Sequence, residues 1–271
     1  MEITPEEVAM KSRMKSIWMA GDFGEIGHYL ETEAQDFVER LRIPAGSKVL
    51  DVACGTGNSA IPAAKAGATV TGVDIASNLL EQARLRAQKE GVKARFEEGD
   101  AEDMPYEDGE FDYVVSMFGV MFAPHPEKAA AELGRVCRPG GLIALANWTP
   151  QGFAGRMFAA TAKYVPPRTD IPPPVLWGDE TTVRQRLSPY ASSIQTSPCT
   201  LNFKYPFSPA GTVALFKKYF GPTIVAFSKL EAEEQKSLTA DLENLWTSMN
   251  EPTDGTTQVK AEYLEVKAVR K

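Results

Sequence analysis

Short apolar segments alternate with segments of helical periodicity over residues 31–148. We predict strands at residues 49–52, 68–74, 92–98, 111–117 and 142–148. The segments between and before them repeat apolar residues at i, i+3, i+4 and i+7, as Ala34, Phe37, Val38 and Leu41 do, which is the spacing of one helix face. This alternation predicts an α/β fold, a Rossmann-like parallel sheet with helices on both faces that binds ligands at the carboxyl ends of its strands.

The segment before this core predicts an N-terminal helical cap, residues 1–44. Met10, Met14, Ile17 and Trp18 follow helical spacing, and three glycines then interrupt any long helix. The aromatic side chains of the cap, together with its one histidine, are candidates for lining a substrate pocket: Trp18, Phe23, His28 and Tyr29.

The segment after Pro150 predicts an antiparallel edge for the sheet. We expect helices over residues 151–164 and 178–187, an extended proline-rich stretch between them, and strands over 193–207 and 259–269. Two helices inserted between these strands form either a lid or a dimer surface: one starts at Ser208-Pro209 and continues through Phe220, and a longer one covers about residues 238–249. Because no flexible linker interrupts the chain, we expect one domain over residues 1–271, with a cofactor-binding core at 45–150 and the edge strands with inserted helices at 151–271.

The stretch Lys48–Asn58, KVLDVACGTGN, predicts the cofactor site. A buried strand leads into a turn containing Ala53, Gly55 and Gly57, and a helix follows. Glycines let a ligand approach the backbone, and the N–H groups of such a turn and helix start point at it. The spacing also satisfies the loose dinucleotide pattern, but the carboxylate of Asp51 suits a ligand with an ammonium and a sulfonium better than a pyrophosphate. The turn therefore favours S-adenosylmethionine over NAD.

A second acidic residue, Asp74, follows the second strand about 20 residues beyond the turn, where a carboxylate accepts hydrogen bonds from ribose hydroxyls. Both cofactors carry an adenosine ribose, so Asp74 does not distinguish between them. We expect Asp74 and the adjacent Ile75 to contact the cofactor, and we expect Ser77 or Asn78 to cap the following helix instead of Asp74.

Four segments in order resemble the class I S-adenosylmethionine-dependent methyltransferases: DVACGTG, VTGVDIASNLLEQAR, FEEGDAEDMPYEDGEFDYVVS and RVCRPGGLIALANW. The resemblance spans about residues 35–150 and is nearest the type 11 group that includes quinone-biosynthesis enzymes. It implies a seven-stranded methyltransferase fold, adenine recognition by Asp100 and Ala101, and a strand end at Ser116 and Met117 that borders the transferred methyl. It also implies that the N-terminal cap covers the cofactor.

The implied activity is methyl transfer to a small, aromatic or hydrophobic acceptor by in-line displacement. Two alternatives remain open: an NAD-dependent oxidoreductase that uses the same glycine turn, and a protein that binds S-adenosylmethionine without methylating. Alignment and desolvation supply most of the catalysis, so a general base is optional. We assign none, and the candidates are His125, His28 and Tyr29, with Tyr164 as a further one.

Composition narrows the partners. The net charge of −7 disfavours a nucleic-acid backbone as ligand, and no run of about 18 apolar residues predicts a membrane span. Three scattered cysteines, Cys54, Cys137 and Cys199, have neither metal-ligand nor disulfide spacing, so we expect no metal and a cytoplasmic location. The oligomeric state, including a homodimer, is left open.

Overall fold

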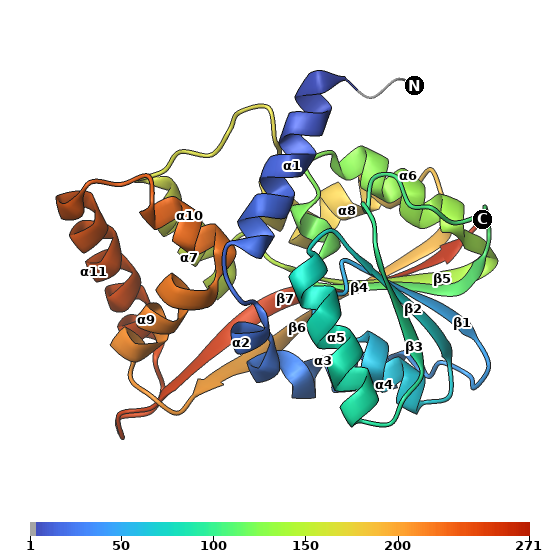
Figure 1. Ribbon diagram of the computed structural model, residues 1–271, viewed down its shortest axis with the longest axis horizontal. Helices are drawn as coiled ribbons and strands as arrows, with labels where there is room; N and C mark the ends of the chain where they lie inside the picture. Colours follow the sequence, from blue (N-terminus) through green and yellow to red (C-terminus); the bar gives the residue numbers. More distant parts are fainter. Residues whose placement is uncertain (1–3) are drawn as a thin grey trace.

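The computed structural model describes residues 4–271, and its centre is a seven-stranded sheet (Figure 1). The strands lie in the order β3-β2-β1-β4-β5-β7-β6. The first five are parallel, and β7 pairs antiparallel with both β5 and β6. The predicted Rossmann-like sheet with an antiparallel C-terminal edge is confirmed. The bounds of the strands are β1 (Lys48–Val52), β2 (Thr69–Asp74), β3 (Ala94–Glu98), β4 (Phe111–Met117), β5 (Cys137–Trp148), β6 (Ala191–Tyr205) and β7 (Thr257–Arg270).

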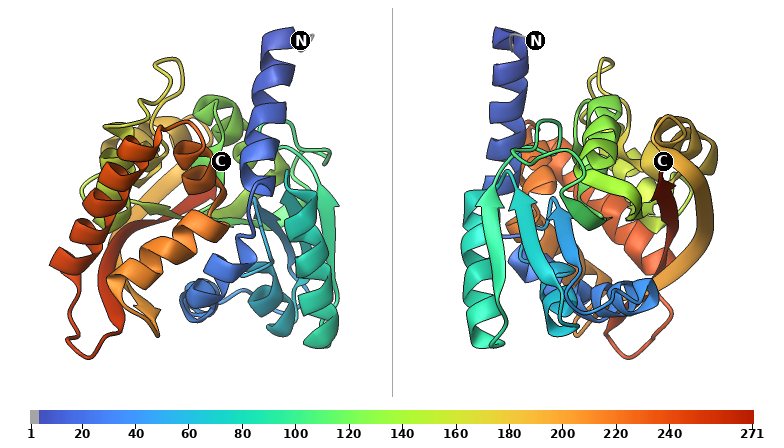
Figure 2. Two further views of the ribbon diagram at one scale, coloured as in Figure 1. Left: turned by 60° about the vertical axis from the view of Figure 1, so that its left-hand side comes forward. Right: turned by 90° about the vertical axis from the view of Figure 1, so that its right-hand side faces the viewer.

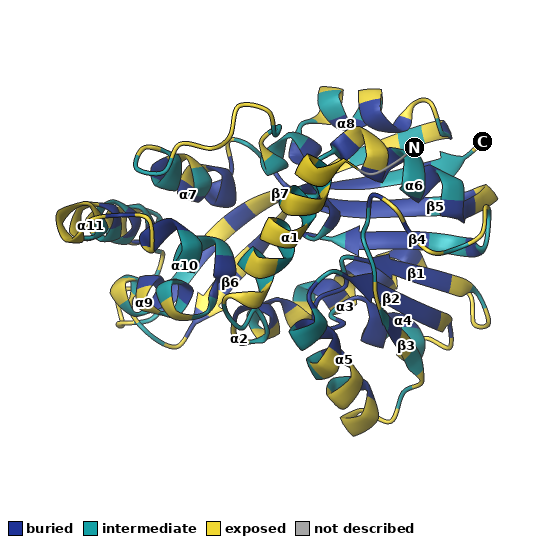
Figure 3. Cartoon of the chain, turned by 45° about the horizontal axis from the view of Figure 1, so that its top comes forward, coloured by how far each residue is buried: buried dark blue, intermediate teal, exposed yellow. Residues whose placement is uncertain are grey.

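Helices cover both faces of the sheet. Figure 1 shows α3 (Glu31–Leu41), α4 (Ala60–Lys65) and α5 (Ser77–Lys89) on one face, and α6 (Pro126–Val136) and α8 (Glu180–Leu187) on the other. Each helix turns an apolar stripe inward, and the central strands between them are buried on both sides (Figure 3). Pro126 begins α6, where its missing N–H costs no hydrogen bond.

The fifth strand differs from the prediction. We expected Pro139, Gly140 and Gly141 to end the preceding helix and the strand to begin at Leu142, but the strand starts at Cys137. Phe111 of β4 pairs with Cys137 and Tyr113 pairs with Leu142, so the intervening residues form an irregularity inside the strand. Gly140 has φ +70°, which lets the chain bend there without breaking the pairing.

The N-terminal cap consists of α1 (Pro5–Met19), α2 (Gly24–Gly27) and the 3-10 helix η1 (His28–Leu30). Residues 1–3 of the predicted cap lie outside the described residues. Thr4 and Glu7 form a capping box at the start of α1. No residue of α1 is buried, and the helix stands out from the body of the protein (Figure 2). Contacts at its surface, and not burial of whole residues in the core, therefore hold it in place.

The C-terminal segment places α7 (Phe153–Ala162), the 3-10 helix η3 (Pro174–Gly178) and α8 before β6. Three helices, and not two, lie between β6 and β7: α9 (Pro209–Tyr219), α10 (Gly221–Phe227) and α11 (Ala232–Met249). We expected one helix to continue through Phe220, but the chain turns extended there and restarts at Gly221-Pro222. The division of the chain into one domain with three sections stays a prediction.

Candidate active site

A cavity lies at the carboxyl ends of the central strands. The turns after β1, β2, β3 and β4 all contribute to its wall, and α1 and the 3-10 helix η2 (Val120–Phe122) cover it from above. This is where a parallel sheet whose strand order reverses between neighbouring strands binds its ligand. Among the sequence-predicted residues, it brings together Asp51, Ala53, Gly55, Asp74, Ile75, Asp100, Ala101 and Met117.

The turn after β1 is strained where the cavity meets it. Ala53, Gly55 and Gly57 have φ of 54°, 52° and 82°, values that glycine adopts freely and alanine only at a cost. Gly119 packs so closely on this turn that an added Cβ would lie 2.5 Å from the carbonyl oxygen of Ala53. Gly119 therefore lets the segment after β4 lie directly against the turn after β1.

Asp74 holds the glycine turn. Its Oδ2 accepts from the Gly55 N–H at 2.8 Å, and its Oδ1 accepts from the Ala76 N–H at 2.8 Å. Neither Ser77 nor Asn78 caps α5, so our expectation that one of them would relieve Asp74 of that role is wrong. Ala76 occupies the capping position and has no side-chain acceptor, which leaves the Asp74 carboxylate to receive the helix-start N–H.

Asp51 is buried at the end of β1, and its Oδ2 has no hydrogen-bond partner among the described residues. Burial, with the negative charge of Asp74 nearby, raises the pKa of Asp51 to about 8. Burial also raises the pKa of Asp74 and, well above its usual value, that of the neighbouring Cys54 thiol. The site therefore favours a cationic ligand that would restore the charge of these carboxyls.

Asp100 joins the cavity to the cap. Its Oδ1 accepts from the Glu102 N–H at 2.9 Å, and its Oδ2 lies 2.6 Å from Lys11 Nζ of α1. A second ion pair joins Lys15 to Glu98, and a third joins Glu7 to Lys128 of α6. Charged pairs therefore position α1 across the mouth of the cavity.

Two predicted cofactor residues lie outside the cavity lining. Gly57 packs against Phe96, whose Cζ would lie 3.2 Å from an added Cβ. Ser116 is fully buried, donates to the Val52 carbonyl oxygen at 2.6 Å and accepts from the Val120 N–H at 2.9 Å. Both residues shape the strand ends around the cavity.

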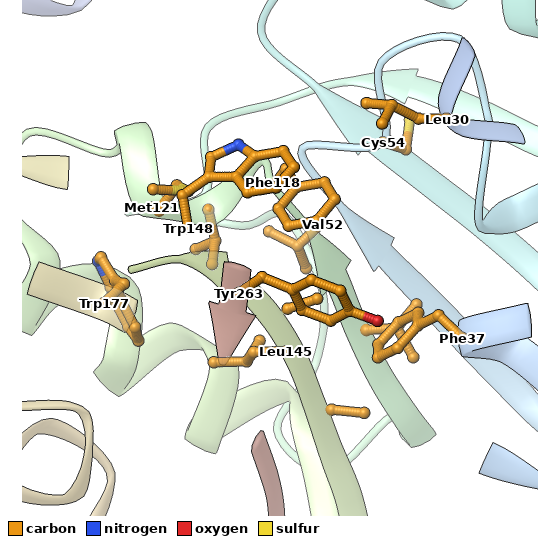
Figure 4. Packing of buried hydrophobic residues seen from close by; sticks show 14 of the residues in the cluster. Leu30, Phe37, Val52, Cys54, Phe118, Met121, Leu145, Trp148, Trp177 and Tyr263 are labelled. Atoms are coloured by element: carbon orange, nitrogen blue, oxygen red, sulfur yellow. The ribbon is translucent and has the colours of Figure 1, made fainter. Parts of the chain in front are cut away.

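The remaining wall is aromatic and apolar. Trp18 of α1 packs edge-on against Phe122 and Phe23, with ring centroids 4.9 and 5.9 Å apart. Phe118, which follows β4 at φ 56°, stacks on Trp148 at 3.7 Å (Figure 4). Two further aromatic residues, Phe153 and Trp177, are buried in the core and do not line the cavity.

The candidate bases lie off the cavity lining. His28 is exposed and its ring packs on Tyr29, which in turn packs on Tyr205. His125 is the N-cap residue that precedes α6, and its Nδ1 and backbone N–H both bond to the buried carboxylate of Glu102, at 2.8 and 2.6 Å. The hydroxyl of Tyr164 donates to Asp241 at 3.2 Å, on the far helices.

Sequence reasoning missed several lining residues: Met14, Leu30, Thr56, Asn58 and Ser59. Asn58 and Ser59 directly follow the glycine turn, and their polar side chains at that point could have identified them as cavity-lining residues. Leu30 carried no signal, because an apolar residue beside a helix is ordinary core.

No described residues form a cluster of three or more His, Cys, Asp or Glu suited to a metal ion. Over the same part of the chain, no helix has the length and apolar character needed to cross a membrane.

Comparison with known proteins decides the family. Residues 49–141 match the family model of a methyltransferase domain. The chain is 37% identical over 227 residues to the uncharacterized protein Rv1405c of Mycobacterium tuberculosis, covering 83% of each chain. It is 40% identical over 125 residues to methyltransferase GfsG of Streptomyces halstedii, covering 45% of each. The fold matches that of YcgJ from Bacillus subtilis with a TM-score of 0.62 at 17% identity, over 89% of this chain and 99% of that one.

The chain belongs to the class I S-adenosylmethionine-dependent methyltransferases. The cofactor of this methyltransferase is S-adenosylmethionine, which sets aside the NAD alternative. The cavity fits that cofactor, because the buried and unpartnered Oδ2 of Asp51 suits its ammonium group. Assignment to the type 11 group stays a prediction.

Proposed function

We propose that this methyltransferase acts on a small acceptor with a flat aromatic or apolar body. One observation carries the proposal: the character of the cavity changes along the sheet. The ends of β3, β2 and β1 carry Asp100, Asp74 and Asp51, whereas the end of the next strand, β4, carries Met117 and Phe118. A donor extended over the three acids would point its reactive end toward the apolar wall.

We assign the donor contacts accordingly. Asp100 and Ala101 would hold the adenine, Asp74 and Ile75 the ribose, and Asp51 the ammonium group. Gly55, which has no side chain, would allow close approach of the amino-acid end to the turn, and Ala53 would contact that end with its backbone and small side chain. Gly57 and Ser116 would act through the shape of the turn and of the strand ends, since they do not line the cavity.

The protein's share of the chemistry is alignment and exclusion of water. When bound, S-adenosylmethionine supplies a methyl group on a sulfonium; the acceptor attacks the methyl carbon in line and displaces the sulfur as a neutral thioether. Trp18, Phe23 and Phe122 would hold the flat acceptor and keep water away from it. Because the histidines and Tyr29 lie off the cavity lining, the acceptor would provide its own ionised or lone-pair nucleophile.

The test is a transfer assay with labelled methyl donor and two groups of acceptors, flat phenols and thiophenols against polar aliphatic amines. We expect transfer to the aromatic group, and Trp18→Ala should lower its kcat/KM by about tenfold or more, as loss of a buried aromatic contact predicts. Preferential methylation of the aliphatic amines would contradict the proposed acceptor class. The cytoplasmic location and a homodimer stay predictions.

A further inference from the structure

Two ionisable side chains, Asp74 and Arg86, bond to consecutive residues of the glycine turn, Gly55 and Thr56. Asp74, at the end of β2, accepts from the Gly55 N–H. Arg86, from the last turn of α5, donates through Nη1 to the Thr56 carbonyl oxygen at 2.9 Å and to Thr56 Oγ1 at 3.2 Å. Asp74 fixes the Gly55 N–H and Arg86 fixes the Thr56 carbonyl. Hydrogen bonds to ionisable groups therefore orient the turn, in addition to the conformations of its glycines.

The same guanidinium fixes the side chain of Asn58. Arg86 Nη1 donates to Asn58 Oδ1 at 2.6 Å, and Asn58 Nδ2 donates to the Gly27 carbonyl oxygen at 2.8 Å. Asn58 lines the cavity, and Gly27 ends α2 of the cap. Both ends of the amide are used, which sets its orientation.

Arg86 also contacts α3, the helix that directly follows the cap. Its Nη2 lies 3.0 Å from Glu31 Oε1, at the first residue of α3. The Arg86 side chain is 24% exposed and does not line the cavity. Any effect on a ligand must therefore pass through Thr56 and Asn58.

We propose that Arg86 is a positioning residue that shapes the glycine turn around the amino-acid end of the methyl donor and ties that turn to the N-terminal cap. The inference rests on the proposed placement of the donor, with its ammonium group at Asp51. It predicts that loss of the guanidinium weakens recognition of the amino-acid end and leaves recognition of the nucleoside end intact, since Asp100 and the ribose side of Asp74 lie outside the Arg86 contacts.

The experiment compares two ligands by calorimetric titration. S-adenosylhomocysteine carries the amino-acid end, and 5′-methylthioadenosine keeps the nucleoside but lacks it. Arg86→Gln should lower the affinity for S-adenosylhomocysteine by about tenfold, the effect of losing hydrogen bonds from a charged donor. The affinity for 5′-methylthioadenosine should stay within about twofold of the wild-type value. Arg84→Gln is the matched control, because Arg84 lies on the same helix and donates to a carbonyl of β3, that of Phe96. It should change neither affinity.

Arg86→Lys guards against a folding defect in the first variant. The lysine keeps the charge and an aliphatic stem but lacks the planar guanidinium fork. We therefore expect the affinity for S-adenosylhomocysteine to fall by about threefold and the affinity for 5′-methylthioadenosine to stay unchanged. Equal weakening of both ligands would show that Arg86 merely supports the fold, and unchanged S-adenosylhomocysteine binding would show that it does not position the turn. Either result overturns the inference. Failure of the wild-type protein to bind S-adenosylhomocysteine would instead overturn the proposed donor placement.

Discussion

At the scale of single residues, Asp51 links stability to binding. Its raised folded-state pKa, about 8, means that the folded protein keeps a proton that the unfolded chain releases near the ordinary aspartate pKa of 3.8. Stability should therefore fall as pH rises between these values. Asp51→Asn should remove part of this loss of stability with rising pH. The rest should remain, because the pKa of Asp74 is raised as well.

We expect Asp51→Asn to be more stable than the wild type at pH 8, by about 1 kcal/mol or more, and equal to it near pH 4. The same variant should bind S-adenosylhomocysteine more weakly, because the ammonium group loses its counter-charge. Urea unfolding across pH 4–9 measures the first effect. A variant that is less stable than the wild type at pH 8 would show that Asp51 is ionised and satisfied in the folded protein.

Ala53 stores strain in the glycine turn. An L-residue at φ 54° costs roughly 1–2 kcal/mol, while a glycine costs about 0.4–1 kcal/mol more in unfolded-chain entropy. Ala53→Gly should therefore raise the free energy of unfolding by about 0.5 kcal/mol. Ala63→Gly, in α4, is the control and should lower it by about 1 kcal/mol. If both variants lose stability equally in urea, the turn is not strained at Ala53.

Residues at strand ends were predictable from the sequence, whereas side chains positioned by distant partners were not. Asp51, Asp74 and Asp100 each follow a recognisable apolar strand, so the shared edge of a parallel sheet brings them together. The orientation of His125 depends on Glu102, 23 positions earlier in the chain, and no local pattern reveals such a bond. The link from Arg86 to Asn58 was hidden for the same reason.

At the scale of elements, α1 depends on close backbone contact with the C-terminal helices. A Cβ added at Gly221, the first residue of α10, would lie 2.0 Å from the Ile17 carbonyl oxygen of α1. One added at Gly21 would lie 2.2 Å from the Tyr219 carbonyl oxygen. Two glycines therefore let the cap lie directly on the junction of α9 and α10.

Gly221→Ala should displace α1 and expose Trp18 to water. The other three tryptophans, Trp148, Trp177 and Trp246, are buried, so a shift of the emission maximum to longer wavelength reports on Trp18. Ser228→Ala, at the opposite end of α10, is the control and should leave the emission unchanged. An unchanged spectrum for Gly221→Ala would mean that the cap is not seated by this contact.

Elements with strong periodicity were predicted with their correct type, from α3 through β4. The misses are local and have physical causes. The helix predicted from Ser208 breaks at Phe220 because Gly221 and Pro222 restart it, and β5 begins early because β4 recruits Cys137 across an irregular pairing. Pairing with a neighbouring strand is a tertiary effect that single-segment patterns do not contain.

At the scale of the whole molecule, the strand order explains why one cavity contains both polar and apolar walls. Strands β3, β2 and β1 extend in one direction from the switch point, and β4 and β5 extend in the other. The acids follow the first group, and the apolar residues follow the second. The alternation of strands and helices predicted a parallel sheet with helices on both faces, but the strand order and the covering by α1 and η2, which creates the cavity, required the folded structure.

The most direct test of the account is calorimetric titration of the protein with S-adenosylhomocysteine, with NADH in parallel and Asp74→Ala as the variant. The account predicts micromolar binding of S-adenosylhomocysteine with one site per chain. It predicts that binding falls by about tenfold or more in the variant, as loss of charge-assisted hydrogen bonds implies, and that NADH does not bind. Binding of NADH alone, or S-adenosylhomocysteine binding that is insensitive to Asp74, would contradict the donor placement on which the proposed function rests.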